Sequence, residues 1–427
     1  MKGISVDQLE DGARIADQFR RQTPALSRLV QGKTPVYMDA PGGTQMPQPV
    51  LQGMSNYVRH GMANRHGAFA TSVETDDLLD RVREQVRALL NADGYVIVFG
   101  QNMTSLCFAL AASLARDWAP GQRRDQVVVS EIDHHANIDP WRAVAADRGM
   151  GLRWLPVDTG RVSLDLDRLD EIVTSRCAVT AVGLASNAVG TIQDVTRIAQ
   201  RTHEAGGIIV VDAVHAVPHM PVDAPALGAD VLLCSAYKFF GPHIGVMAIR
   251  DELLERIRFY KVAPAPNTGP DKAEAGSQNH EAVAGLSAAL EFMASLGRGE
   301  TMRERLVDTI SAVASSEDAL AVKLSASLAA VPGVRLFRAP VGHAKTPTIA
   351  FTVKEAAPLA IARACAQEAV FVTNGDFYAT TLAERFGLGE SGGWVRLGLA
   401  PYIGEAEVSR AIAAVTQAAG EATKVAR

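Results

Sequence analysis

The feature that most constrains the fold is a series of short, almost uninterrupted apolar segments in the middle of the chain, separated by amphipathic stretches. Strands are predicted for these segments, at residues 95–99, 127–130, 151–155, 178–184, 208–212, 231–234 and 245–250. Helices are predicted between them, at 101–115, 140–148, 166–172, 195–205 and 225–227. Continuous apolar strands separated by helices are typical of a parallel sheet that is buried on both faces. The sequence therefore predicts an α/β fold with a mostly parallel central sheet covered by helices on both faces.

The order of elements changes after this region, which indicates a second structural unit. A loop rich in glycine and proline is predicted at 259–278, and helices follow at 281–295 and 302–330. The remaining predicted elements are strands near 348–353, 370–373 and 395–399 and helices at 358–368 and 405–422. We therefore expect an N-terminal segment (1–36) that packs with the small domain, a large domain (37–283), and a smaller α+β domain (284–427).

Charge, hydropathy and cysteine content exclude several classes of protein. The formal net charge is −5 and no basic patch is visible, so nucleic acid and anionic membranes are not expected as partners. The longest apolar runs are too short to span a bilayer, and the first residues lack the apolar core of a signal peptide, so a cytoplasmic location is expected. The four cysteines have neither Cys-x-x-Cys nor zinc-ligand spacing, which predicts buried, inert thiols and no metal; they are Cys107, Cys177, Cys234 and Cys365.

Lys238 directly follows one of the predicted strands. The strand at 231–234 runs into small and polar residues, and after the lysine Phe239-Phe-Gly-Pro-His-Ile-Gly turns tightly towards the next strand. A lysine in this place lies at the carboxyl end of a parallel strand, where open α/β sheets bind ligands. Taken alone, Lys238 could equally be a solvated surface lysine.

Asp212 and His134 follow or end two other strands of the same set. Asp212 lies 26 residues before Lys238, which leaves room for one crossover to a neighbouring parallel strand. An aspartate there could also cap a helix or bind a metal, but no second carboxylate lies close by in the sequence. The imidazole of His134 could stack on a flat ligand. The adjacent His135 suggests a metal, yet neighbours in an extended segment point to opposite sides and rarely bind one ion.

A helix is expected to open immediately after the strand at 95–99, at Phe99-Gly-Gln-Asn-Met-Thr-Ser. Free backbone N–H groups and the helix dipole favour a dianion at such a point, although capping alone would explain Asn102. Pyridoxal phosphate needs an amine, a carboxylate for its ring nitrogen, a flat group over the ring, and donors for its phosphate. The sequence offers a candidate for each, and predicts that Lys238 forms a Schiff base with pyridoxal 5′-phosphate.

Four segments resemble the class V aminotransferase family of fold-type I pyridoxal-phosphate enzymes, and within it the group-II cysteine desulfurases. They are Asp-His-His-Ala-Asn-Ile-Asp-Pro-Trp (133–141), Ser-Asn-Ala-Val-Gly-Thr (186–191), Val-Asp-Ala-Val-His-Ala (211–216) and Ser-Ala-Tyr-Lys-Phe-Phe-Gly-Pro-His-Ile-Gly (235–245). The resemblance covers most of the chain, from residue 37 to the strand that contains Arg396. It implies the fold-type I architecture.

The resemblance also implies roles for particular residues. Lys238 would hold the cofactor and move the substrate Cα proton, Asp212 would pair with the ring nitrogen, and His134 would stack on the ring. Arg396 would clamp the substrate carboxylate, a task that suits a planar guanidinium; the alternative is a surface salt bridge. Other residues are implied near the ring hydroxyl or substrate (Asn187, His215) and near the phosphate (Gln101, Asn102, Ser235, Tyr237). Ser277 would reach the phosphate of a partner subunit, which implies a homodimer.

The sequence departs from the desulfurase pattern in the small domain. Those enzymes carry a nucleophilic cysteine within Arg-x-Gly-His-His-Cys-Ala, and the matching stretch here is Thr373-Asn-Gly-Asp-Phe-Tyr-Ala. Gly375 and Ala379 are kept, but Tyr378 stands at the cysteine position, and a phenol cannot accept sulfur. The nearest cysteine, Cys365, lies inside a predicted helix. A second departure is Tyr237, where a histidine usually precedes the lysine.

These observations predict a pyridoxal-phosphate enzyme that acts on an amino acid through a Cα carbanion, with Lys238 as the base. We expect C–S or β-lyase chemistry, or cysteine desulfurase-like chemistry, on cysteine or a cysteine derivative, without a persulfide relay. An aminotransferase or epimerase of the same family is the alternative. A non-catalytic cofactor-binding protein is a third hypothesis, against which the complete set of site residues argues. Tyr378 is either a proton donor to a leaving group or product, or a lid residue.

Overall fold

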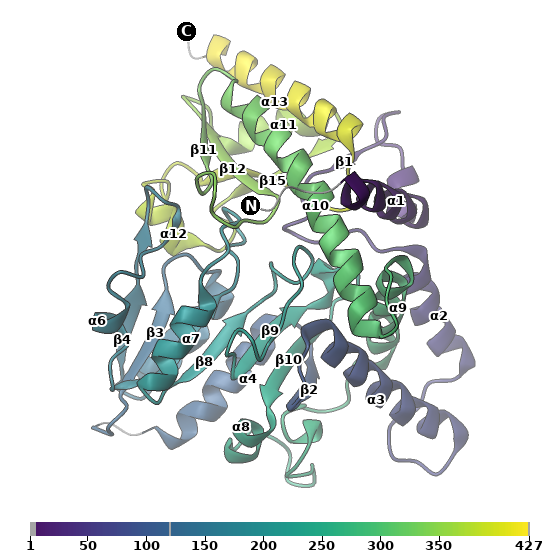
Figure 1. Cartoon of the computed structure of the whole chain (residues 1–427), viewed down its shortest axis with the longest axis vertical. Coiled ribbons are helices and arrows are strands. Elements are labelled where there is room, and N and C mark those ends of the chain that lie inside the picture. Colours follow the sequence, from purple (N-terminus) through teal and green to yellow (C-terminus); the bar gives the residue numbers. More distant parts are fainter. Residues whose placement is uncertain (1–5, 119–120, 426–427) are drawn as a thin grey trace.

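The central element of the computed structural model, which describes residues 6–118 and 121–425, is a seven-stranded sheet with the order β2-β10-β9-β8-β7-β3-β4 (Figure 1). Its strands are β2 (Tyr95–Gly100), β3 (Gln126–Ser130), β4 (Gly151–Leu155), β7 (Cys177–Gly183), β8 (Ile208–Asp212), β9 (Val231–Ser235) and β10 (Gly245–Arg250). Neighbouring strands from β9 to β4 pair in parallel, which confirms the mostly parallel sheet.

β10 is the exception, because it is antiparallel to both of its neighbours, β9 and β2. Only the segment 236–244 connects it to β9, and a parallel connection needs a crossover of about a dozen residues or more. The other six strands therefore still point in one direction, and their carboxyl ends meet along a single edge of the sheet.

Both faces of the sheet are covered, as the apolar strands predict. Along β8, Val210 belongs to one hydrophobic cluster, whereas Ile209 and Val211 belong to the other. The first cluster includes residues of α4 (Met103–Leu114), α5 (Asp139–Asp147) and α8 (Asp251–Arg256). The second includes residues of α3 (Ala70–Leu90), α7 (Val195–Glu204), α9 (His280–Leu296) and α10 (Met302–Ala329). Alternate side chains of one strand thus pack into separate cores.

A second, antiparallel sheet has the order β11-β12-β15-β14 and lies above the first in Figure 1. Its strands are β11 (Val334–Phe337), β12 (Thr348–Val353), β14 (Thr373–Gly375) and β15 (Trp394–Gly398). The helices of this region are α11 (Pro358–Gln367), α12 (Thr380–Arg385) and α13 (Glu405–Val425). A short parallel pair, β1 (Val36–Tyr37) with β13 (Val370–Phe371), ties the start of the chain to this region.

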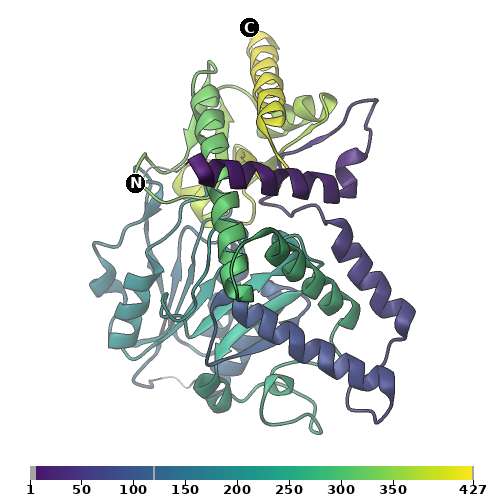
Figure 2. The same ribbon diagram turned by 45° about the vertical axis from the view of Figure 1, so that its right-hand side comes forward.

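The long helix α10 runs from the large sheet to the small one, and α1 (Val6–Gln22) packs across it (Figure 2). The expected domain limits at 36/37 and 283/284 stay predictions. Within the described residues, no helix is both long and apolar enough to cross a membrane.

Two helix predictions need correction. The helix expected at 225–227 is wrong, because this segment is a turn that closes at Gly228 with a φ of +72°. In addition, α2 (Gln48–His60) was not predicted; Val50 is its one fully buried residue. α2 packs against α9.

The loop after β7 is joined to the segment before β12 by backbone hydrogen bonds. Ile192 N donates to Ala344 O (3.0 Å), and Thr346 N donates to Gly190 O (2.8 Å). Gly190 has a φ of +79°, and a Cβ atom there would lie 2.8 Å from Thr346 Oγ1, so only glycine permits this approach. These bonds hold the small sheet against the carboxyl edge of the large one.

Candidate active site

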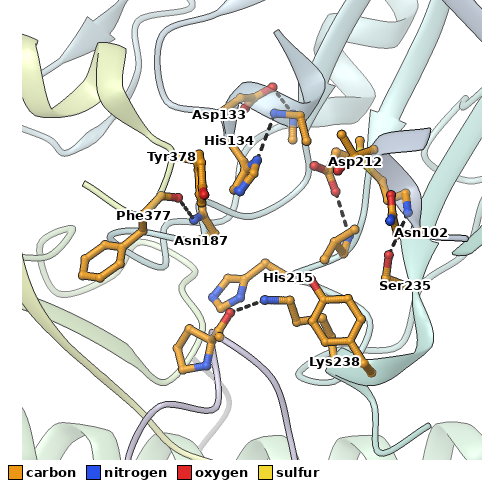
Figure 3. Close-up of a pocket in the computed structure, with 18 of the residues that line it drawn as sticks. Asn102, Asp133, His134, Asn187, Asp212, His215, Ser235, Lys238, Phe377 and Tyr378 are labelled. Atoms are coloured by element: carbon orange, nitrogen blue, oxygen red, sulfur yellow. Dashed lines mark hydrogen bonds between the residues drawn. The ribbon is translucent and has the colours of Figure 1, made fainter. Parts of the chain in front are cut away.

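A cavity of about 540 Å³ lies at the carboxyl ends of the parallel strands and is closed on one side by the small domain (Figure 3). Every residue that the sequence predicts for the site lines this cavity except Ser277. Ser277 is exposed, in the loop between the short helix Pro270–Lys272 and α9. The strand edge therefore brings together side chains that are far apart in the sequence.

Lys238 projects into the cavity from the turn after β9. Its Nζ donates a hydrogen bond to Pro41 O and lies 5.0 Å from the centre of the Tyr237 ring. Burial lowers the pKa of the Lys238 ammonium from 10.5 to about 7, and the charge of Arg396 lowers it further, while Asp212 and Asp39 act in the opposite direction. Near pH 7, a substantial fraction of this amine is therefore unprotonated and nucleophilic.

Asp212 ends β8 and lines the cavity, as does a second carboxyl group, that of Asp133. Asp212 Oδ1 accepts a hydrogen bond from Val214 N (2.9 Å). Burial raises the pKa of Asp212 to about 7, Asp133 raises it as well, and Lys238 lowers it. A cation placed against this carboxylate would favour its charged form, because opposite charges lower a carboxyl pKa. The site thus provides an acidic group that needs a positively charged partner.

His134 lines the cavity beside Tyr378, and a hydrogen bond fixes the orientation of its ring. Its Nδ1 accepts a hydrogen bond from Ala136 N (2.9 Å), so the proton of the neutral ring is on Nε2. Burial lowers the pKa of His134 from 6.5 to about 4, and the charges of Lys238, His135 and Arg396 lower it further. The result is a neutral, flat imidazole, which suits stacking on an aromatic ligand.

The start of α4 forms the end of the cavity opposite Tyr378 (Figure 3). Asn102 caps this helix by accepting from Ser105 N (2.9 Å), and Ser235 Oγ accepts from Met103 N (2.9 Å). Gln101 and Thr104 also line the cavity here. The first N–H groups of a helix have no partners within it, and together with the dipole they attract an anion.

Arg396 comes from β15 of the small sheet and is buried, with 4% of its surface exposed. Its Nη1 donates to Asn187 O (2.8 Å), but its buried Nε has no partner among the described residues. Burial lowers the pKa of Arg396 to about 9, which the carboxylate of Asp39 partly offsets. A buried guanidinium with an unused donor is a site for a carboxylate ligand.

Asn187 and His215, which follow β7 and β8, contact residues that belong to the region of the small sheet. Asn187 Nδ2 donates to Phe377 O (2.9 Å), and its buried Oδ1 has no partner in the described part of the chain. His215 Nε2 contacts the hydroxyls of Thr346 (3.1 Å) and Thr348 (2.9 Å). Burial lowers the pKa of His215 well below 6.5, so the ring is neutral.

No cysteine lies among the described residues that line the cavity. All four cysteines are buried elsewhere, and burial raises the pKa of each thiol, for Cys365 to about 12 and for Cys177 to about 11. Thiols in such surroundings are poor nucleophiles. The prediction that Cys365 is structural agrees with its place inside α11.

Several lining residues were not predicted as part of the site. Asp133 is fully buried, accepts from Asn137 Nδ2 and Gly183 N at Oδ2, and leaves Oδ1 without a partner among the described residues. Burial raises its pKa to about 6. Its place next to His134 was the available signal. Phe377 and His243 were also missed, because their positions depend on turns whose geometry the sequence pattern does not determine.

These features fit pyridoxal phosphate. The cavity holds an amine, a buried carboxylate, a neutral flat ring and a helix N-terminus, and the unpartnered buried atoms Asp133 Oδ1, Asn187 Oδ1 and Arg396 Nε call for polar partners. Two glycines allow the backbone to approach Asp133 and Tyr237 closely. A Cβ atom at Gly183 would lie 2.8 Å from Asp133 Oδ1, and one at Gly43 would lie 3.3 Å from the Tyr237 ring. The residues present therefore match the needs of this cofactor.

Comparison with known proteins gives a consistent result. The model of the family "Aminotransferase class-V" matches residues 36–411. A cysteine desulfurase of Synechococcus elongatus is 32% identical over 392 residues, which cover 87% of this chain but only 59% of that relative. A probable cysteine desulfurase of Streptomyces coelicolor is 30% identical over 399 residues, covering 88% of this chain and 91% of the relative.

Solved structures show the same likeness. A cysteine desulfurase from Escherichia coli superposes with a TM-score of 0.80 at 28% identity, over 94% of this chain and 98% of the other. An apo cysteine desulfurase from Thermococcus onnurineus superposes with a TM-score of 0.82 at 23% identity, over 95% and 98%. The second likeness concerns the fold alone.

Proposed function

The chain belongs to the class-V aminotransferase family and is a pyridoxal-phosphate-dependent enzyme with cysteine desulfurase-like chemistry; we propose that it breaks the Cβ–S bond of a cysteine derivative by β-elimination, without a persulfide relay. One observation carries this proposal. Lys238, Asp212 and Arg396 line a single cavity, and no cysteine is among its described lining residues. The groups that activate Cα are thus present, and the group that would accept sulfur is not.

Residues of the large domain would hold the cofactor. Lys238 would form the covalent link, Asp212 would pair with the ring nitrogen, and His134 would cover one face of the ring. The start of α4 with Asn102, Ser235 and Tyr237 would hold the phosphate. When bound, the cofactor withdraws electrons from Cα, so that the Cα proton becomes acidic.

Lys238 would carry that proton. Substrate binding frees its amine, and the pKa of about 7 lets Nζ accept a proton near neutral pH and release it again. Burial is the main cause of this pKa, so the wall around Lys238 tunes the base. Asp212 and Asp39 limit the shift by stabilising the protonated amine.

Arg396 would bind the substrate α-carboxylate. Its hydrogen bond to Asn187 O holds the guanidinium in place, and Nε remains available for the ligand. A buried ion pair of this kind orients the substrate relative to Lys238, and orientation is a large part of the catalytic advantage of such sites.

The sulfur would leave as a free thiol. The Cα–H bond breaks and its proton passes to Lys238 Nζ; the Cβ–S bond breaks and its electron pair departs with sulfur, which takes up a proton. Water then completes the reaction, so that one S-substituted cysteine and one water give one thiol, one pyruvate and one ammonium ion. No oxidant or sulfur acceptor is required.

A homodimer is part of this proposal. Large apolar side chains are exposed on α2, α3, the loop between them, α4 and the loop that follows α8, which supports a partner surface there. They are Leu51, Val58, Met62, Phe69, Val73, Phe108, Tyr260 and Val262. Ser277 is exposed and would reach the partner's phosphate site. A cytoplasmic location remains the expectation drawn from the sequence.

The proposal is tested by incubating the purified holoenzyme with cysteine, cysteine sulfinate, cystine and S-alkyl cysteines, while pyruvate, thiol and the visible absorbance of the cofactor are followed. Equal amounts of pyruvate and thiol support elimination. Accumulation of the pyridoxamine form would show a transaminase instead, and exchange of the Cα proton with inversion would show an epimerase. If no amino acid changes the absorbance, the proposal fails.

A further inference from the structure

The turn between β14 and α12 has an unusual backbone. Phe377 and Tyr378 are consecutive non-glycine residues, and both have a φ of +57°. Left-handed backbone costs a residue with a side chain about 1–2 kcal/mol. Such conformations persist only where the surroundings fix them, and they are frequent at functional sites. We call residues 376–379 the aromatic turn.

The large domain holds the aromatic turn in place. Asn187 Nδ2 donates to Phe377 O (2.9 Å), and His135 N donates to Tyr378 O (2.7 Å). Within the turn, the carboxylate of Asp376 accepts from Tyr378 N (3.0 Å) and from Thr380 Oγ1 (2.6 Å). The polar groups of the turn are thus largely used in fixing it. What the turn offers to a ligand is mainly aromatic surface.

The two rings have different surroundings. Phe377 lies on the Arg396 guanidinium, with its ring centre 3.9 Å from Cζ, and is nearly parallel to Trp394 at 6.5 Å. Tyr378 faces His134 at 5.3 Å between ring centres, yet 71% of its surface is exposed. Both line the cavity, and Figure 3 shows them with Asn187 and His134 at the end away from Ser235 and Asn102. Phe377 is already packed, whereas most of the Tyr378 ring lacks a partner surface.

The charged groups of the site lie elsewhere in the cavity or are already engaged. Lys238 and Asp212 lie at other places in the cavity, Arg396 is stacked against Phe377, and the carboxylate of Asp376 is hydrogen-bonded within the turn, so a substrate side chain that reaches Tyr378 meets mainly its ring. Aromatic surface is stabilised by burial against apolar or aromatic groups. The side chain of free cysteine is a single CH₂–SH group, which offers far less apolar surface to the Tyr378 ring than an aromatic substituent on sulfur.

We propose that the aromatic turn selects the substrate side chain, with Tyr378 as the specificity-determining residue for cysteine conjugates that carry an apolar or aromatic group on sulfur. This inference rests on the proposed function and gives Tyr378 a role other than that of a proton donor. The residue acts through its ring surface, and the departing thiolate takes its proton from elsewhere.

The test compares S-benzyl-L-cysteine with S-methyl-L-cysteine on the holoenzyme, through the ratio of their kcat/KM values for pyruvate release. A ring contact contributes roughly tenfold, so the wild-type ratio is expected to favour the benzyl substrate by about tenfold or more. Tyr378→Ala is expected to lower this ratio by about tenfold, mainly through KM for the benzyl substrate. Tyr378→Phe is expected to keep the ratio. Val341→Ala, at a residue 90% exposed and outside the cavity, is the matched control.

A ratio unchanged in Tyr378→Ala overturns the inference. A ratio lost in Tyr378→Phe as well as in Tyr378→Ala also overturns it, because the hydroxyl would then matter rather than the ring. Tyr378→Leu serves as the second truncation if Tyr378→Ala does not fold.

A binding measurement separates this inference from the proposed function. The α-methyl analogues of both substrates have no Cα proton and cannot undergo elimination, so the difference between their binding constants, measured by calorimetry with the holoenzyme, reports side-chain recognition. A preference for the benzyl analogue that Tyr378→Ala removes supports the inference even if no pyruvate forms. Equal dissociation constants for the two analogues overturn it, even if elimination is confirmed.

Discussion

The two walls of the cavity differ in how their residues are placed. The large-domain wall consists of side chains at the ends of regular parallel strands, such as Asp212 on β8 and Lys238 after β9. The small-domain wall consists of Arg396 on β15 and the aromatic turn, whose backbone depends on hydrogen bonds from Asn187 and His135. A sheet edge places groups reproducibly and suits the step common to the family. The aromatic turn is not part of a regular strand, so its residues can change without disturbing the large sheet. Such a segment suits the selection of the substrate side chain.

The largest effect is expected at the large-domain wall, from Lys238→Ala. Loss of the base should lower kcat by about 10³- to 10⁴-fold, within the range of general acid–base catalysis, and should abolish the covalent link. Borohydride reduction followed by peptide mass spectrometry measures the link directly. Lys354→Ala, at a lysine with a 78% exposed side chain, is the control. A cofactor adduct at another lysine in the wild-type enzyme would contradict the assignment of Lys238 as the cofactor-binding residue of the large-domain wall.

A buried pair, His219 with Glu317 of α10, joins the segment after β8 to the long helix that runs between the two sheets. His219 Nδ1 lies 2.8 Å from Glu317 Oε2, and the side chains are 6% and 3% exposed. Removing one partner leaves a buried polar group without its hydrogen bond, so Glu317→Ala should lower the free energy of unfolding by about 1–3 kcal/mol. Lys323→Ala on the same helix removes an exposed pair with Glu405 and should cost about 1 kcal/mol or less. Denaturant unfolding of the two apo variants measures both, and equal losses would contradict a buried role for the first pair.

At the small-domain wall, Arg396→Gln removes the proposed carboxylate partner. Charge-assisted hydrogen bonds contribute about 1.5–3 kcal/mol, so kcat/KM should fall by roughly 10- to 100-fold. The check uses binding of substrate analogues with and without the α-carboxylate. The wild-type enzyme should discriminate between them, and the variant should not. Discrimination retained by Arg396→Gln would place the carboxylate elsewhere.

The smallest effect concerns pH and returns to the large-domain wall. The folded-state pKa of Lys238 is lowered from 10.5 to about 7, so its reactive, unprotonated form appears as the pH rises through 7. The rate at which the apo enzyme binds pyridoxal phosphate covalently should therefore rise with a midpoint near pH 7 and change little above pH 8. Stopped-flow absorbance measures this rate. A rate still rising steeply at pH 10 would show an ordinary lysine.

The lowered pKa of Lys238 also determines how the free energy of unfolding of the apo protein changes with pH. Between pH 7 and 10.5 the unfolded chain binds a proton at Lys238 that the folded chain does not, so this group makes the apo protein more stable as the pH rises. The contribution is lost at lower pH, where both states are protonated. Unfolding of apo wild type and Lys238→Ala at pH 7 and 9 separates this effect from those of other groups.

The large-domain wall could be predicted from sequence, because apolar strands have a recognisable pattern and those that carry the site end in or run into polar residues, such as Asp212 and Ser235. Lys238, Asp212 and His134 all line the cavity as expected. The direction of β10 was not part of that pattern; it follows from the short connection after Lys238.

The small-domain wall could be predicted only in part. The place of Tyr378 followed from a motif, but its left-handed backbone depends on Asn187, which bonds to Phe377 across 190 residues. Asp133 was missed because its place next to His134 was the one sequence signal, while the burial of its carboxylate and its unpartnered oxygen are properties of the folded surroundings. The α2 helix was missed as well; Val50 is its one fully buried residue.

The backbone bonds between Gly190–Ile192 and Ala344–Thr346 have a consequence for kinetics. Two segments joined in this way cannot separate without losing paired amide groups, so the walls should stay closed on the timescale of turnover. Ligands would then exchange at the side of the cavity where Tyr378 is exposed, and the release of a product should depend on the residue there. Amide hydrogen exchange should accordingly be slow at Ile192 and Thr346, while the release rate varies with the residue at position 378.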